Sequence, residues 1–165
     1  MNQQNSPKPE LPTSAIKSNR EFEAETEHWF EYTVKAQPHH TDYAGIVWHG
    51  AYLTWMETAR IECLRSIGVD FTELVTLGCD LPVVELSLKY HRPLPLGTKA
   101  VVRTRLAQTA GVRIHWDYEI KSLDYQELFV TGRVTSVGID REKGKIIRRL
   151  PDNLQNALVK IRKVN

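Results

Sequence analysis

The sequence predicts an α+β domain, in which an antiparallel sheet packs against one long helix. Several stretches alternate apolar with polar residues, which is typical of strands with one buried face. One stretch instead repeats its apolar residues at helical spacing, and it lies between the first alternating stretch and the later ones. Since this helix is segregated from the strands, it must cover the apolar face of their sheet.

The length of the chain, 165 residues, suits one domain with a real core and is too short for two. Residues 1–26 contain three prolines among mostly polar residues, a composition that cannot bury enough apolar surface to order itself. We therefore expect a flexible N-terminal tail over residues 1–26 and a single domain over residues 27–165.

The domain is expected to open with a strand from Trp29, in which the apolar positions are Phe30, Tyr32, Val34 and Ala36. A helix should begin near His49 and end before Gly68, which gives it about 18 residues. The positions that recur at helical spacing are Tyr52, Trp55, Met56, Ala59 and Cys63. A short second helical segment is expected at residues 71–77.

Strands are then expected in meander order at residues 81–91, 98–108, 112–121 and 127–140. The first of these places Val84, Leu86, Leu88 and Tyr90 on one face. Prolines and a glycine at residues 93–97 predict the turn that follows it. A turn at Lys143-Gly144 and a last helix after Pro151 complete the expected order.

The pairing register of two expected strands follows from which of their positions, odd or even, face the core. Residues 98–108 and 112–121 both place even-numbered apolar residues inward, so an antiparallel pair must match even with even. The connecting loop then has an odd number of residues, which excludes a two-residue turn at Ala110-Gly111. A loop over residues 109–111 would set Arg103 opposite Asp117 as a cross-strand ion pair.

Charge and cysteine content exclude several classes of protein. A net charge of +2 gives no whole-molecule attraction to nucleic acid or membrane, and the densest basic run lacks interleaved aromatic residues. Cys63 and Cys79 stand among apolar neighbours, which argues against a disulfide framework or a zinc site. Without a signal-type segment or an apolar run of roughly 20 residues, we expect a cytoplasmic protein.

The most informative segment runs over residues 42–52, Asp-Tyr-Ala-Gly-Ile-Val-Trp-His-Gly-Ala-Tyr. It places a carboxylate, Asp42, seven residues before the expected helix start at His49. The unpaired backbone N–H groups of a helix start can hold the negative charge on a carbonyl oxygen under attack. Gly45 suits a sharp bend or a close approach to a ligand. This arrangement favours hydrolysis of an activated ester.

This segment resembles the active-site segment of the 4-hydroxybenzoyl-CoA thioesterase family, and His49 makes it most similar to the YbgC-type acyl-CoA thioesterase branch. The resemblance covers about residues 29–150 and implies the hotdog fold, a curved antiparallel sheet wrapped around a central helix. It implies hydrolysis of an acyl-CoA to free acid and CoA, without a cofactor. It also implies a homodimer or homotetramer with sheets paired edge to edge and the active site at a subunit interface.

The resemblance implies roles for individual residues. Asp42 would be the nucleophile or the general base, and the two routes stay open. The backbone N–H groups near Trp48 and His49 would bind the carbonyl oxygen. The expected substrate-binding residues are Gly45, Val47, Trp48 and Tyr52. The plainer readings are a turn or cap for Asp42 and a place in the core for Tyr52 and Trp55.

Three other groups of residues are weighed against plainer structural roles. The tandem His39 and His40 suggest a metal site, but adjacent side chains on an extended segment point apart and no further ligands accompany them. Glu57 is a second carboxylate on the helix, for which we expect either an ion pair with Arg60 or a buried contact. The basic run of Lys143, Lys145, Arg148 and Arg149 suits either CoA phosphates or a solvated face.

Two rival functions remain. A hotdog dehydratase would carry a histidine in a proline-rich loop with a separate acidic residue, and only His91-Arg92 lies near Pro93 here. A non-catalytic acyl-CoA-binding module would use the same pocket, and Asp42 argues against it. The acyl group, aromatic or aliphatic, is left open because pocket depth depends on side chains that one sequence does not locate.

Overall fold

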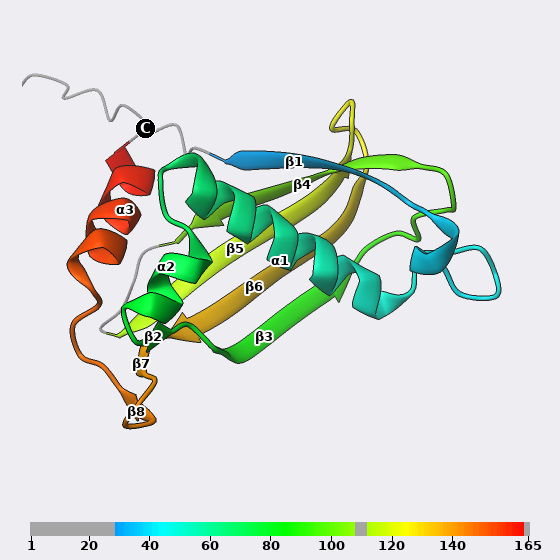
Figure 1. Cartoon of the computed structure of the whole chain (residues 1–165). Helices are drawn as coiled ribbons and strands as arrows, with labels where there is room; N and C mark the ends of the chain where they lie inside the picture. The colour runs from blue at the N-terminus through cyan, green and yellow to red at the C-terminus, as the bar shows by residue number, and fades with distance from the viewer. Residues whose placement is uncertain (1–28, 108–111, 164–165) are drawn as a thin grey trace, which may run out of the picture.

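A computed structural model describes residues 29–107 and 112–163 (Figure 1). Helix α1 (His49–Ser66) lies along one face of a five-stranded antiparallel sheet, and two shorter helices lie near its C-terminal end. The predicted α+β class is confirmed, with the single long helix covering the sheet. The tail expected at residues 1–26 lies outside the described residues.

The main sheet has the strand order β1-β4-β5-β6-β3. Its strands are β1 (Phe30–Lys35), β3 (Val83–Tyr90), β4 (Lys99–Leu106), β5 (Arg113–Ser122) and β6 (Leu128–Val137). The meander prediction is right for β4, β5 and β6 but wrong for β3, which pairs with β6 rather than with β4.

The chain leaves β3 by a crossover, which explains the error. The connection over residues 91–98 buries Leu94 completely and donates from Gly97 N–H to Ala36 O at 2.9 Å, beside β1. It therefore crosses the end of the sheet and delivers β4 to the opposite side, between β5 and the edge strand β1. Prolines at 93 and 95 signal a break in the strand, but they do not distinguish a hairpin from a crossover.

The register of β4 and β5 confirms the predicted parity and corrects the predicted partners. Even residues face even residues, as in the pairs Ala100–Ser122 and Val102–Ile120. However, Arg103 stands opposite Glu119 rather than Asp117, with an ion pair of 2.8 Å. The ladder continues to the hydrogen bond from Ala107 N–H to His115 O, which displaces the pairing by two residues from that of a 109–111 loop.

Helix α1 has 18 residues and ends just before Gly68, as predicted. Gly68 has a φ of +86°, a conformation that favours glycine after a helix. The helix buries its predicted stripe in the core, namely Tyr52, Trp55, Met56, Ala59 and Cys63. Helix α2 (Phe71–Thr76) follows where the second helical segment was expected, capped by the Asp70 side chain, which accepts from Thr72 N–H at 2.9 Å.

Strand β3 is exposed along nearly its whole length. It forms one edge of the sheet, and the apolar face predicted for it is open, since Val84, Leu86 and Tyr90 are each between 44% and 49% exposed. Leu88 is partly buried against the core. An edge strand of eight residues with open apolar side chains is a ready surface for pairing with another strand.

A second layer stands at the C-terminal end of α1. It holds a small sheet of β2 (Cys79–Asp80), β7 (Ile139–Asp140) and β8 (Lys145–Ile146), two of which were not predicted as strands because they are only two residues long. Helix α3 (Asp152–Lys163) follows Pro151 as expected. It packs on the core through Leu154, Ala157, Leu158 and Ile161.

Both cysteines are buried and unpaired. Burial raises the pKa of the Cys63 thiol from its ordinary value of 9.0 to about 12, so this thiol stays protonated at neutral pH. None of the helices in the described ranges is both long and apolar enough for a membrane crossing.

Candidate active site

Asp42 closes a tight turn at the start of the predicted motif. Its Oδ1 accepts hydrogen bonds from Ala44 N–H at 2.8 Å and from Ile46 N–H at 3.2 Å. Its own backbone N–H donates to Ile46 O at 2.8 Å. The carboxylate is therefore held in one orientation by the backbone of its own loop. Asp42 therefore has the turn-forming role that the sequence offered as the plainer reading. This role does not exclude a part in catalysis.

Gly45 provides the bend in this turn. Its φ of +73° lies in the left-handed region, and a Cβ added there would meet no atom within 4 Å. Of the two reasons given for this glycine, the structure supports the sharp bend.

The turn is fixed to the crossover that follows β3. Val47 N–H donates to Leu94 O and Leu96 N–H donates to Gly45 O, both at 2.9 Å. Because Leu94 is fully buried and Val47 is 4% exposed, this contact anchors the turn in the core. The position of Asp42 therefore depends on a segment about 50 residues later in the chain, which local sequence patterns do not reveal.

The N-terminus of α1 offers two free donors next to this turn. Trp48 N–H is already used, because it donates to His40 O at 3.0 Å, and Ala51 N–H donates to Trp48 O at 3.0 Å. In the described part of the chain, no acceptor meets the N–H groups of His49 and Gly50. Of the two residues expected to supply donors, His49 has a free N–H and Trp48 does not, and Gly50 has the second free N–H.

The Trp48 side chain lies against Gly50. A Cβ at Gly50 would come within 2.1 Å of the Trp48 ring, so only glycine lets the indole take this place. The ring also meets the His49 imidazole edge on, with centroids 5.2 Å apart, and remains 44% exposed. Trp48 thus forms an exposed aromatic wall beside the free N–H groups.

An open cleft of about 370 Å³ lies beside the start of α1. It is lined by Ile46, Val47, His49, Tyr52, Tyr90, His91, Arg92 and Pro93. Of the predicted site residues, Val47, His49 and Tyr52 line this cleft. Asp42, Gly45 and Trp48 stand outside its lining, on the neighbouring turn.

The sequence did not single out Tyr90. The Tyr90 hydroxyl donates to His49 O at 3.1 Å, from β3 to the first turn of α1. Its ring centroid also lies 5.7 Å from that of Tyr52, whose pKa is raised by burial. This tyrosine fixes the end of the helix to the sheet. No sequence signal marks such a contact across 41 residues, beyond the position of Tyr90 at the end of a strand.

His91 and Arg92 form the other wall of the cleft. His91 Nε2 lies 2.8 Å from Thr131 Oγ1, and Arg92 forms an exposed ion pair with Glu127 at 3.2 Å. The sequence placed both residues near a proline-rich turn but used them only to weigh a dehydratase. Their contacts hold them to β6 and to the segment before it.

The tandem histidines do not point apart as expected. Residues 38–40 form a short 3-10 helix, η1 (Pro38–His40), and this curvature brings the rings of His39 and His40 to a centroid distance of 4.0 Å. Burial, and then the neighbouring His39, lower the pKa of His40. His40 packs edge on against Trp55 at 5.1 Å. Among the described residues, no three His, Cys, Asp or Glu side chains gather as metal ligands.

The remaining candidates have structural surroundings. Glu57 forms an ion pair with Arg60, one of the two contacts expected for it. The Arg60 side chain is only 5% exposed. Trp55 is buried in the core, as the sequence predicted. The basic run of residues 143–149 lies around β8 and ahead of α3, on the side of the molecule away from the start of α1 (Figure 1). Within one chain it does not reach the start of the helix.

Comparison with known proteins identifies the family. The model of the thioesterase superfamily matches residues 44–129, which run from within the motif turn, after Asp42, through α1, β3, β4 and β5 to the start of β6. The chain belongs to the thioesterase superfamily. A relative in Synechocystis, a putative esterase named sll0410, is 56% identical over 162 residues, which are 95% of this chain and 98% of that one.

More distant thioesterases match as well. The chloroplastic acyl-acyl carrier protein thioesterase ATL3 of Arabidopsis thaliana is 30% identical over 78% of this chain and 67% of its own. The acyl-CoA thioester hydrolase YbgC of Escherichia coli is 25% identical over 76% of this chain and 92% of its own. The expected similarity to the YbgC branch is confirmed, and this member of the thioesterase superfamily is a thioester hydrolase.

Solved structures confirm the hotdog fold. A DHNA-CoA thioesterase from Staphylococcus aureus is 27% identical and has a TM-score of 0.75, covering 83% of this chain and 93% of that one. The protein SAV2348 from the same organism, solved in complex with CoA, shares the fold with a TM-score of 0.75 at 18% identity, over 83% of this chain and 85% of its own.

Proposed function

We propose that this thioester hydrolase acts on an acyl-CoA beside the start of α1, releasing the free acid and CoA. The observation that carries the proposal is the presence, within nine residues of chain, of a carboxylate with fixed orientation and two unpaired N–H groups at a helix start. The carboxylate can supply or activate the attacking oxygen. The two N–H groups can stabilise the negative charge that develops on the carbonyl oxygen.

In the proposed mechanism, the thioester carbonyl oxygen accepts hydrogen bonds from the N–H groups of His49 and Gly50. Asp42 either attacks the carbonyl carbon, giving a mixed anhydride that water then hydrolyses, or removes a proton from an attacking water. In both routes the C–S bond breaks and CoA leaves as a thiol. Loss of one oxyanion donor costs about 3 kcal/mol in other hydrolases, so the helix start should contribute as much as the carboxylate.

The proposed reaction needs no metal or other cofactor, because Asp42 supplies the base or nucleophile and the helix start supplies the electrostatic stabilisation. Dialysis against a strong chelator should therefore leave the rate of thiol release unchanged. A rate that falls on dialysis and returns with a divalent metal would reject this part of the proposal.

We propose that a second copy of the chain completes the site. Asp42 is exposed and stands outside the lining of the cleft, and the adjacent Tyr43 is fully exposed. The open edge of β3, which carries Tyr90, supports antiparallel pairing with β3 of a second chain. Such pairing would cover the apolar side chains of β3 and enclose the cleft in a dimer, from which a tetramer can be built.

The carrier of the acyl group has a second candidate. The similarity to ATL3, an acyl-acyl carrier protein thioesterase, favours a carrier protein, whereas the CoA complex of SAV2348 favours CoA. Both carriers present the acyl group as a thioester, so the proposed chemistry at Asp42 is the same for each. The choice depends on contacts outside the reacting atoms.

Thiol release decides between hydrolysis and mere binding. The full chain is incubated with aliphatic and aromatic acyl-CoAs and with an acyl carrier protein that bears the same acyl groups, and the free thiol is followed with a chromogenic reagent. We expect turnover with at least one acyl-CoA, and its acyl group defines the substrate class. Recovery of intact, tightly bound thioester from every reaction would instead identify a binding module.

A further inference from the structure

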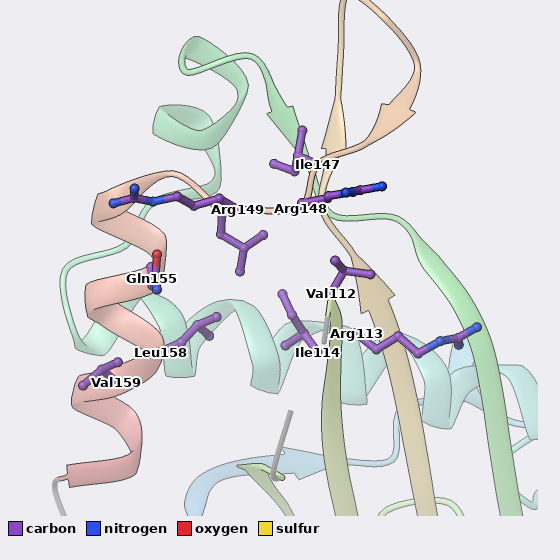
Figure 2. A pocket seen from close by; sticks show the side chains of 10 residues that line it. Val112, Arg113, Ile114, Ile147, Arg148, Arg149, Gln155, Leu158 and Val159 are labelled. Carbon is purple, nitrogen blue, oxygen red and sulfur yellow. The ribbon is translucent and has the colours of Figure 1, made fainter. Parts of the chain in front are cut away.

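A second cavity lies far from the cleft, between α3, the start of β5 and the segment over residues 147–150 (Figure 2). Its volume is about 220 Å³. It belongs to the second layer at the C-terminal end of α1, so no residue of the motif turn touches it. The proposed hydrolysis makes no use of it.

One part of the cavity lining is apolar. Figure 2 shows Ile114 of β5, Val112 just before that strand and Leu158 of α3 directed into the same space. Ile114 is 3% exposed and Leu158 is 7% exposed, so both belong to the hydrophobic core. These apolar side chains offer a bound hydrocarbon group the close contacts that water does not provide.

The polar part of the lining is cationic. Arg113, Arg148 and Arg149 line the cavity together with one amide, Gln155, and the described lining includes no carboxylate. Arg113 and Arg149 form exposed ion pairs, with Glu85 at 3.4 Å and Asp152 at 3.1 Å. Arg148 is exposed and forms no ion pair within the described chain. Figure 2 shows Arg148 and Arg149 extending in opposite directions from the segment beside the cavity.

We propose that this cavity is a binding site for a small monocarboxylate, with its hydrocarbon body between α3 and β5 and its carboxylate paired with Arg148. An apolar cavity of about 150 Å³ holds benzene, so a space about half as large again suits a body of roughly six to nine carbon atoms. Arginine suits the head group because its planar guanidinium matches both oxygens of a carboxylate. Carboxylates of this kind are the class of product that the proposed hydrolysis releases, but binding here does not depend on that reaction.

Methyl NMR of the full chain tests the site with octanoate as the probe. The expected result is a saturable shift of the methyl signals of Ile114, Ile147 and Leu158, while those of Ile46 and Val47 beside the cleft move less. Octanol should bind more weakly than octanoate, and octylammonium should bind weakest. Shifts confined to Ile46 and Val47, or no saturable shift at all, would overturn the proposal. Equal binding of octanol would overturn the role of Arg148.

Two variants and a matched control test where the carboxylate and the hydrocarbon part of octanoate bind. Arg148→Gln should weaken octanoate binding by about tenfold, the loss of one charge-assisted contact. Lys145→Gln removes a charge from the same basic run without touching the cavity and should leave binding unchanged. Val112→Phe should occupy the space and abolish binding while the remaining methyl spectrum stays folded. Equal losses from the Arg148 and Lys145 variants would show general charge attraction and overturn the site.

Discussion

At the scale of single residues, Asp42 shows how a structural and a chemical role share one side chain. Oδ1 holds the turn through two backbone N–H groups, and within the described chain no hydrogen bond reaches Oδ2. The sequence offered these roles as alternatives. In the structure they are compatible, because a carboxylate has two oxygens and the turn uses one.

Other residues could not be placed from the sequence. The tandem histidines were expected to point apart, but the 3-10 turn at Pro38 folds them together. Trp48 was expected to supply an N–H donor, but the carbonyl of His40 already accepts from it. Both errors concern local backbone geometry, which depends on tertiary contacts that residue types do not encode.

Tyr90→Phe tests whether the first turn of α1 must be fixed for turnover. The change removes the 3.1 Å hydrogen bond to His49 O and keeps the ring against Tyr52. One such bond is worth about 1 kcal/mol. We expect kcat for thioester hydrolysis to fall by roughly fivefold with little change in KM, since the N–H donors act mainly in the transition state.

Tyr125→Phe is the matched control for this variant. It removes a hydroxyl that donates to Glu31 Oε2 at 2.7 Å, and neither residue lines the cleft. Its kinetics should equal those of the wild type. A Tyr90→Phe enzyme with unchanged kcat would remove this tyrosine from the positioning of the helix.

At the scale of elements, the spacing of apolar residues predicted α1 almost to the residue. A helix with one buried stripe and a glycine after its end has few alternatives, so local signals suffice. The pairing of strands is different. Parity was predictable from alternation, but the two-residue displacement of β4 against β5 depends on where the ladder ends, which alternation leaves open.

The burial of Cys63 on α1 predicts a loss of stability at alkaline pH. Its pKa is raised to about 12 in the folded chain, while an exposed thiol has its ordinary value of 9.0. The stabilisation is therefore complete below pH 9 and is lost as the pH rises towards 12, since only the unfolded chain releases the proton. The slope contributed by one such group approaches about 1.4 kcal/mol per pH unit.

Urea unfolding between pH 8 and pH 11 measures this slope. Wild type should lose stability more steeply than Cys63→Ala, which is less stable at pH 8 because of the cavity it leaves but lacks this titration. Parallel pH dependence of the two proteins would show that Cys63 does not titrate as its burial requires.

At the scale of the whole molecule, the order of strands was the main error. The sequence suggested a meander, whereas β3 lies at the far edge beside β6 and the chain crosses back to β4. This topology brings residues 94–96 against the motif turn and Tyr90 against the start of α1. The candidate site is thus assembled by long-range connections, which explains why the motif was visible in the sequence and its supports were not.

The exposed edge of β3 predicts assembly. Leu86→Lys places a charge in the middle of this edge, where pairing with a second chain would bury it. We expect wild type to sediment as a dimer or a larger oligomer, and the variant to shift towards monomer and lose thioester hydrolysis. Ile146→Lys, at a site that is 56% exposed on β8, should change neither property. A wild-type monomer with full turnover would refute the shared site.

The central claim is that Asp42 and the start of α1 hydrolyse an acyl-CoA. The most direct measurement is kcat for wild type, Asp42→Asn and Asp124→Asn on the best acyl-CoA, with folding checked by thermal unfolding. Asp124 is a matched control because its Oδ1 also accepts from the backbone N–H two residues later, at 3.1 Å, but in a turn outside the cleft. The account predicts a fall of kcat by about a hundredfold or more for Asp42→Asn, as for loss of a general base, and no change for Asp124→Asn. A folded Asp42→Asn enzyme with the wild-type rate would contradict it.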